Sequence, residues 1–249
     1  MNRSSLTMFS LLCLVLLALP LPLLAREPLP QKFRIDGEAL VFDTETDITG
    51  AASEITPEDI DAFRTILADN PQVTEIRLNS SGGSVYAGAE IAWIVMDHGL
   101  NTSVDGECVS ACVDIFLAGQ RRRMMLGSKI GFHQRSWAPE AVQSYYREWR
   151  DDEDWATPFE FGSWIYQDTQ EEIYEQLTYL VSRGVDPAFA IETMRVRPNA
   201  EWYPSRLRLV AAGVLREQAP QDQSHRDSSL DPQGGLRQMD AQHSPACAC

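Results

Sequence analysis

Between residues 74 and 134, short apolar segments alternate with glycine-rich or polar turns, and this alternation constrains the fold more than any other feature. The segments 74–78, 101–104 and 128–132 have the length and composition of strands. Apolar residues at helical spacing occupy the stretches between them. Strands that alternate with helices predict a mostly parallel sheet covered by helices, which is an α/β fold. In such folds functional groups gather at the carboxyl ends of the strands.

The neighbouring segments complete this prediction. Residues 33–42 alternate apolar and polar positions around a glycine, which predicts a hairpin or two short strands. A helix is expected to begin near Thr56, because a threonine, a proline and then an aspartate three residues on form a capping pattern. Two further helices are expected over 86–98 and 110–119, the second made of small and apolar residues suited to burial.

Three of the predicted turns carry residues that are useful for acyl transfer. Gly82 and Gly83 follow one strand, and without Cβ atoms they let the backbone present bare N–H groups. Ser110 follows the next strand, where Ala111 begins a helix whose N–H groups and dipole favour an oxyanion. His133 follows the third strand and is the candidate base that a serine hydroxyl needs. Alone, each residue suits a turn, a cap or a polar surface; their combination predicts a catalytic centre.

Four short motifs carry a resemblance to a known family: Asn79-Ser-Ser-Gly-Gly-Ser-Val85, Glu107-Cys-Val-Ser-Ala-Cys112, Leu117-Ala-Gly119 and Gly131-Phe-His-Gln134. Together they resemble the proteolytic subunit of the Clp protease and the wider Clp/crotonase superfamily, in particular its exported bacterial members. The resemblance covers residues 33–134 well and 181–215 loosely, and it does not extend to the segment between them. It implies a Clp/crotonase-like spiral of ββα units with an inserted helical arm, assembled as a homo-oligomer.

The same resemblance implies roles for individual residues. Ser110 would be the nucleophile and His133 its general base, while the N–H groups of Gly83 and Ala111 would form the oxyanion hole. The implied function is a serine hydrolase, specifically a peptidase acting on polypeptides without a metal or an organic cofactor. The alternative is a catalytically inactive module of the same fold that binds a partner protein in the periplasm. A thioester enzyme of the crotonase type is disfavoured, because its anionic nucleotide cofactor suits neither export nor an acidic chain.

More than one residue could orient the histidine. The Clp protease has an aspartate late in its domain, whereas the corresponding stretch 198–205 of this chain contains none. Asn199 is assigned on alignment position, and Glu201 is the alternative. An asparagine holds the histidine tautomer in some cysteine proteases. A Ser–His dyad without a third member is also open.

The two ends of the chain differ in character from the domain. Residues 1–25 have a basic start, an uncharged apolar core and a small residue before Arg26, which predicts a signal peptide and a periplasmic or secreted protein. If the segment is retained, it would be a membrane anchor. Residues 218–249 are rich in polar residues and predict a disordered tail. The remainder, 26–217, suits one domain, and its aromatic-rich part at about 139–180 is the predicted arm.

Charge and composition limit the partners further. The net charge of −15 disfavours nucleic acid, whose phosphates it repels. The one basic cluster, Arg121–Arg123, is expected on a solvated turn. The aromatic residues of the arm are expected to pack internally or against another subunit, with a substrate-binding surface as the alternative. Cys108 and Cys112 are interpreted as two small buried residues, and a disulfide across the serine turn is the alternative.

Overall fold

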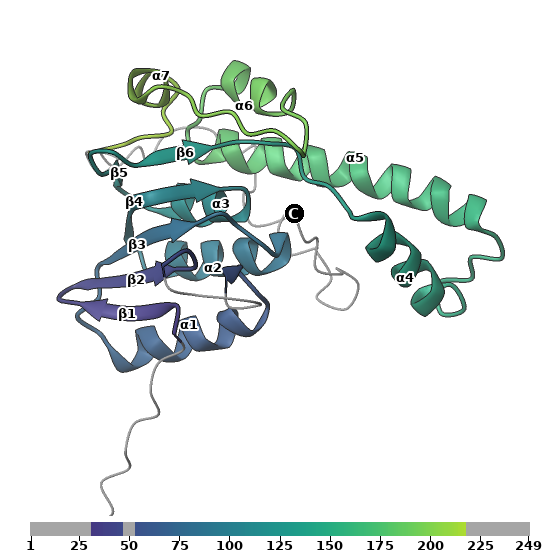
Figure 1. Cartoon of the computed structure of the whole chain (residues 1–249), viewed down its shortest axis with the longest axis horizontal. Coiled ribbons are helices and arrows are strands. Elements are labelled where there is room, and N and C mark those ends of the chain that lie inside the picture. The colour runs from purple at the N-terminus through teal and green to yellow at the C-terminus, as the bar shows by residue number, and fades with distance from the viewer. Residues whose placement is uncertain (1–30, 47–52, 218–249) are drawn as a thin grey trace, which may run out of the picture.

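The computed structural model describes residues 31–46 and 53–217. The predicted signal segment 1–25 and the predicted tail 218–249 lie outside the described residues. The described part folds into one mixed sheet with helices packed against it and a helical arm that projects from one end (Figure 1). No helix within the described ranges combines the length and the apolar character needed to span a membrane.

The sheet contains six strands in the described part of the chain: β1 (Phe33–Asp36), β2 (Ala39–Asp43), β3 (Glu75–Ser80), β4 (Asn101–Val109), β5 (Arg122–Met124) and β6 (Lys129–Gly131). Their order is β1-β2-β3-β4-β5, and β6 also pairs with β4. The first two strands form an antiparallel hairpin, and every other pairing is parallel. The α/β class predicted from the alternation of strands and helices is therefore confirmed.

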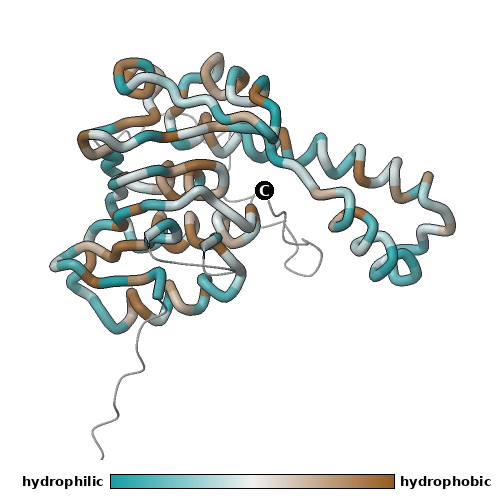
Figure 2. Tube along the Cα trace, viewed as in Figure 1, coloured by the Kyte–Doolittle hydropathy of each residue, from teal (hydrophilic) through white to brown (hydrophobic). Residues whose placement is uncertain are grey.

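Seven helices connect or follow these strands in the described ranges: α1 (Glu58–Asp69), α2 (Val85–Asp97), α3 (Ala111–Ala118), α4 (Pro139–Trp149), α5 (Pro158–Ser182), α6 (Pro187–Thr193) and α7 (Arg206–Ala211). The first three each connect two strands of the sheet, and the first unit is ββα, since β1 and β2 precede α1. Figure 1 shows α4 and most of α5 extending away from the sheet as the arm. This projecting part is mainly hydrophilic, with isolated apolar positions along it (Figure 2).

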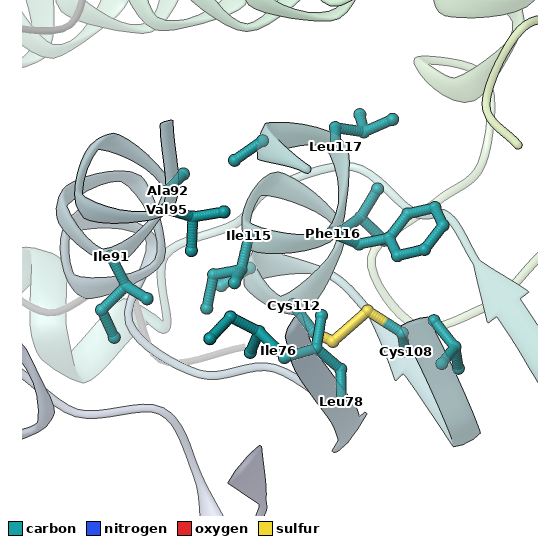
Figure 3. Packing of buried hydrophobic residues seen from close by; sticks show 14 of the residues in the cluster. Ile76, Leu78, Ile91, Ala92, Val95, Cys108, Cys112, Ile115, Phe116 and Leu117 are labelled. Carbon is teal, nitrogen blue, oxygen red and sulfur yellow. A yellow bond between two sulfur atoms is a disulfide. The ribbon is translucent and has the colours of Figure 1, made fainter. Parts of the chain in front are cut away.

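The main core lies between the sheet and the helices α1, α2 and α3. On β3, burial alternates along the strand, so that Ile76 and Leu78 face the core. Every residue of α3 is buried, as its small and apolar composition predicts. Figure 3 shows side chains of α2 and α3, among them Ile91 and Ile115, meeting those of β3. Because α3 is enclosed on all sides, its first turn is held firmly in the interior.

Strand β4 is longer than the predicted segment 101–104, since it continues to Val109. Gly106 allows this continuation, because its φ is 123° and a Cβ there would lie 2.2 Å from the side-chain oxygen of Asn79. That oxygen accepts a hydrogen bond from the Glu107 N–H at 2.9 Å. The second half of β4 then pairs with β6, where Val109 lies opposite Gly131. The pairing brings the ends of these two strands side by side.

The arm has a small core of its own. Tyr145, Trp155 and Phe161 are buried there, and Trp149 and Trp164 pack around them. Tyr145 is the centre of the cluster, because its ring lies within about 6 Å of several neighbouring rings. Internal packing, one of the two interpretations of these aromatics, therefore accounts for most of them.

The basic cluster 121–123 departs from its prediction, because Arg122 is fully buried in β5 instead of lying on a solvated turn. Its guanidinium donates to the carbonyl oxygens of Leu117 at 3.1 Å, Arg183 at 3.0 Å and Gly213 at 2.7 Å. These carbonyls terminate α3, α5 and α7, where helix dipoles favour a cation. Burial and the nearby Arg216 and Arg183 lower the pKa of Arg122 to about 9, which leaves it charged at neutral pH.

Candidate active site

Ser110 occupies the one-residue turn between β4 and α3. Its φ of 56° and ψ of −129° lie in a region that residues with a side chain rarely adopt. Such a conformation costs about 1–3 kcal/mol and persists where the surroundings enforce it. Nucleophilic serines of other hydrolases stand on strained strand-to-helix turns, which expose the hydroxyl oxygen at the end of a sheet. Ser110 has the same local setting.

The glycine loop that follows β3 packs directly against this turn. Gly82 has a φ of 112°, and a Cβ there would lie 2.7 Å from the Ser110 Cβ and 2.9 Å from the Val109 carbonyl oxygen. Gly83 has a φ of 140°, and a Cβ there would lie 2.4 Å from the carbonyl oxygen of Ile55. The loop therefore lies between Ile55 on one side and Ser110 on the other. Neither Gly82 nor Gly83 has room for a side chain.

The hydrogen bonds of this loop fix the direction of one backbone donor. The Gly82 carbonyl accepts from the Ile55 N–H at 2.8 Å, and the Ser84 N–H donates back to the Ile55 carbonyl at 2.8 Å. In a trans peptide the carbonyl and the following N–H point in opposite directions. The Gly83 N–H consequently points away from Ile55, toward the side on which Ser110 lies.

A second backbone donor comes from the start of α3. Ala111 is the first residue of the helix, and the first N–H groups of a helix have no partner within it. Such groups carry the positive end of the helix dipole and bind anions readily. The start of α3 and the glycine loop thus meet at Ser110, since a Cβ on Gly82 would lie 2.7 Å from the Ser110 Cβ and 3.3 Å from the Ala111 nitrogen.

His133 lies two residues beyond β6 and is partly exposed. Its Nδ1 atom is 2.7 Å from the backbone carbonyl oxygen of Gln134. A carbonyl oxygen only accepts, so Nδ1 carries the hydrogen and, in the neutral ring, Nε2 keeps a free lone pair. That is the tautomer in which an imidazole accepts a proton from a serine hydroxyl.

Ser110 and His133 line the same cleft. Val113, Phe132 and Leu180 supply apolar surface to its wall, and polar residues complete it. The structure therefore brings together the two residues that the sequence placed in one catalytic centre. They come together because β4, which precedes Ser110, pairs with β6, which precedes His133.

Among the described residues, His133 Nδ1 has its hydrogen bond with a backbone carbonyl and none with Asn199. Asn199 is exposed on the segment after α6, and the Glu201 carboxylate lies against the hydroxyl of Tyr203. Within the described residues, the partner of Nδ1 is the backbone carbonyl of Gln134. Gln134 is itself anchored to the same segment. Its N–H donates to the Val196 carbonyl at 2.8 Å and its side chain to the Met194 carbonyl at 2.6 Å.

A polar cluster that the sequence did not point to fastens β6 beside β4. Glu107 forms an ion pair with Lys129 at 2.8 Å and accepts a hydrogen bond from the hydroxyl of Tyr203. Burial alone would raise the pKa of Glu107, but these two contacts outweigh it and hold the pKa below its ordinary value. The Tyr203 ring lies under Lys129 and against Gly131, where a Cβ would be 2.7 Å from a ring carbon. The cluster stabilises the strand that delivers the histidine.

Charged side chains form the far wall of the cleft. Arg135 pairs with Asp114 at 3.1 Å, and burial raises the pKa of Asp114 although Arg135 opposes that effect. An adjoining pocket shares Asp114, Arg135 and Gln176 with the cleft and adds Glu175. Burial, together with the nearby Glu171, raises the pKa of Glu175 to about 7. In the described ranges, histidine, cysteine and carboxylate side chains form no group of three or more that suits a metal ion.

Cys108 and Cys112 form a disulfide across the serine turn, with Cα atoms 5.3 Å apart. The interpretation of two unlinked small residues is therefore wrong, although both are fully buried as it required. Figure 3 shows the bond joining the end of a strand to the first turn of a helix. The sharp strand-to-helix turn at Ser110 brings their Cα atoms into the usual range for a disulfide.

Comparison with known proteins adds a distant similarity. No protein-family model and no curated protein sequence matches the chain. Among solved structures, ClpP1 from Listeria monocytogenes is similar with a TM-score of 0.41 and 16% identity, over 65% of this chain and 84% of that chain. An asparagine-to-aspartate mutant of the same protein gives a TM-score of 0.43 and 18% identity over the same shares. A likeness at this level concerns the fold, and the chemistry of the cleft follows from its own residues.

Proposed function

We propose that the chain is a serine hydrolase in which Ser110 is the nucleophile and His133 the general base. One observation carries this proposal: Ser110, on its strained turn, and His133, with Nδ1 bound to a carbonyl, line one cleft. The N–H groups of Gly83 and Ala111 stand beside the serine as candidate oxyanion donors. A serine that served only as a helix cap would need neither the strained turn nor the oriented histidine.

The proposed reaction follows from these positions. The Ser110 hydroxyl oxygen attacks the substrate carbonyl carbon while Nε2 of His133 takes the hydroxyl proton. The tetrahedral oxyanion accepts hydrogen bonds from Gly83 and Ala111, which stabilise charge as it develops. His133 then returns the proton to the leaving group, and the acyl group stays on Ser110. Water, deprotonated by the same histidine, attacks the acyl-enzyme and releases the acid.

We infer that the Gln134 carbonyl orients the histidine in the place where the Clp family has an aspartate. It holds the required tautomer, and its own anchors at Met194 and Val196 keep it in position. A carbonyl carries only a partial charge, so it stabilises an imidazolium less than a carboxylate does. Turnover is therefore expected to be slower than that of a full triad. Asn199 acts only if its loop moves toward the ring.

We propose a polypeptide substrate and an exported location for the same protein. The four motifs that resemble the Clp protease support peptidase activity. The segment 1–25 supports export to the periplasm or beyond, and so does the Cys108–Cys112 disulfide, because disulfides persist mainly in oxidising compartments. We further propose a homo-oligomer, for which exposed apolar residues such as Leu207 provide surface.

A second candidate function is supported by the outer surface of the arm. Phe159, Tyr166 and Tyr174 on α5 are 87%, 68% and 60% exposed, and they take no part in the small aromatic core of the arm. Exposed aromatic residues of this kind are common in protein-binding surfaces. The chain would then be an inactive binding protein whose cellular effect is lost with Phe159→Ser and Tyr166→Ser but survives Ser110→Ala.

A fluorophosphonate probe tests the hydrolase directly, because it phosphonylates only activated serines. We expect labelling of the mature protein at Ser110, and loss of that labelling in Ser110→Ala and His133→Ala. Ser205→Ala is the matched control, since Ser205 is an exposed helix cap far along the chain. Unchanged labelling of Ser110→Ala would remove the nucleophile assignment. No labelling of the folded wild-type protein would favour the binding function.

A further inference from the structure

The Cys108–Cys112 disulfide has a specific place relative to the proposed nucleophile. Cys108 belongs to the end of β4 and Cys112 to the first turn of α3, and Ser110 is the residue midway between them. The two half-cystines are fully buried in the main core, and Figure 3 shows the β3 side chains Ile76 and Leu78 beside the bond. The bond therefore closes the smallest loop that contains the strained serine.

The strain of the turn requires an external constraint. A serine at a φ of 56° would relax toward a negative φ if the flanking elements could shift. On the strand side, the pairing of Cys108 with Ile130 and of Val109 with Gly131 fixes the chain. On the helix side, the Val113 N–H donates to the Ser110 carbonyl at 2.9 Å. Those contacts fix each element separately.

The disulfide joins the two elements to each other. Without it, only the turn itself would connect α3 covalently to the end of β4, and packing alone would set the position of the enclosed helix to within the small shifts that a close-packed core allows. Such a shift would displace the hydroxyl of Ser110 and the N–H of Ala111 together, since both belong to the same turn. Misplacement by about 1 Å can cost roughly 100-fold in rate.

We propose that the Cys108–Cys112 disulfide positions the nucleophile and one oxyanion donor, so that the hydrolase is active only in its oxidised form. This inference rests on the proposed function. Formation of the disulfide removes two electrons and two protons from the two thiols. A dithiol–disulfide oxidoreductase or a small disulfide such as oxidised glutathione accepts them. The chain would thus be inactive in a reducing compartment and become active where disulfides form.

Because the disulfide is buried, its redox state is set while the chain folds. Both sulfur positions are enclosed in the core, and thiol–disulfide exchange needs access for an attacking thiolate. The folded, oxidised protein should therefore resist a dithiol reductant that has free access to exposed disulfides. Protein folded in the presence of that reductant should instead reach a folded but unreactive form.

The test compares the double variant Cys108→Ala/Cys112→Ala with the full-length wild-type protein. Both are followed by the rate of fluorophosphonate labelling and by kcat and KM on a peptide substrate, with circular dichroism and a thermal melt as checks of folding. We expect a folded variant whose labelling rate and kcat fall roughly tenfold or more, while KM changes little. Labelling at the wild-type rate would overturn the positioning role.

Two controls separate positioning from simple loss of stability. Ile66→Ala removes a buried side chain from α1, far from the turn, and should lower stability without slowing the labelling of the folded protein. Wild-type protein folded under reduction should recover labelling after oxidised glutathione is added, whereas the double variant should not. If the double variant fails to fold, this recovery decides the question, and its absence would overturn the proposal.

The outcomes also separate this inference from the function on which it rests. If the oxidised wild-type protein is labelled at Ser110 and the double variant labels equally fast, the hydrolase stands and the positioning role is wrong. If the oxidised wild-type protein is not labelled at Ser110, the hydrolase proposal fails and the positioning role fails with it.

Discussion

Replacing Gly82 by alanine tests the contact between the glycine loop and the serine turn. The added Cβ would lie 2.7 Å from the Ser110 Cβ and 2.9 Å from the Val109 carbonyl oxygen. Unstrained carbon contacts lie at about 3.5–4.0 Å, so the loop or the turn must move. The φ of 112° is also unfavourable for any residue with a side chain. Gly82→Ala should therefore disturb stability and the position of Ser110 together.

The expected size follows from two contributions. An unfavourable positive φ costs about 1–2 kcal/mol, and overpacking in a close-packed site typically adds about 1–3 kcal/mol. The sum of about 2–5 kcal/mol corresponds to a fall in Tm of roughly 4–20 °C for a domain of this size. Gly37→Ala is the matched control, because Gly37 has a φ of 61° and no atom within 4 Å of its added Cβ. It should lower Tm by only about 2–8 °C.

The assay combines thermal melts followed by circular dichroism with the rate of fluorophosphonate labelling. Gly82→Ala should melt below Gly37→Ala, and its folded form should label more slowly than the wild-type protein. Gly37→Ala should keep the wild-type labelling rate, because its hairpin is remote from the cleft. If Gly82→Ala matches Gly37→Ala in both measurements, the loop does not pack against Ser110 as described.

Three further substitutions test other parts of the structure. Arg122→Ala removes the donor to three buried carbonyls, each worth about 1 kcal/mol or more, and should lower Tm by at least roughly 6 °C; an unchanged Tm would contradict the role of Arg122 at the helix ends. Glu175→Gln should stabilise the protein more at pH 8 than at pH 4.5. Burial and the nearby Glu171 raise the pKa of Glu175 in the folded state from 4.5 to about 7. The wild-type protein therefore loses stability as the pH rises from 4.5 to 7, and the glutamine variant does not. An equal difference in Tm between variant and wild type at both pH values would contradict this pKa shift. Removing the Cys108–Cys112 loop closure, with a sequence separation of 4, should cost about 2 kcal/mol in urea unfolding; no loss would mean that the bond is absent or that its loss is fully compensated.

Much of the fold could be predicted because it depends on local patterns. The apolar runs before Gly82, Ser110 and His133 mark strands β3, β4 and β6, and the helical spacing between them marks α2 and α3. Parallel pairing then requires the three strand ends to lie at one edge. The juxtaposition of serine, histidine and glycine loop follows from that topology alone, without knowledge of any side-chain contact.

The remaining features depend on partners that residue types do not reveal. The guanidinium of Arg122 donates to backbone carbonyls 61 and 91 residues away, and a run of three arginines does not reveal that the middle one is buried. The partner of His133 Nδ1 is likewise a backbone carbonyl, that of Gln134. Because every residue has a backbone carbonyl, the sequence pattern, which points to a side chain such as that of Asn199, does not single this one out. The spacing of the two cysteines allowed a disulfide without requiring one.

A crystal structure of the fluorophosphonate adduct is the most direct test of the proposed catalytic centre. The account predicts phosphorus bonded to the Ser110 Oγ, with one phosphonyl oxygen about 2.7–3.1 Å from the N–H nitrogens of Gly83 and Ala111. It also predicts that His133 Nδ1 still donates to the Gln134 carbonyl. An adduct on another residue, or a phosphonyl oxygen directed to solvent and away from both N–H groups, would contradict it.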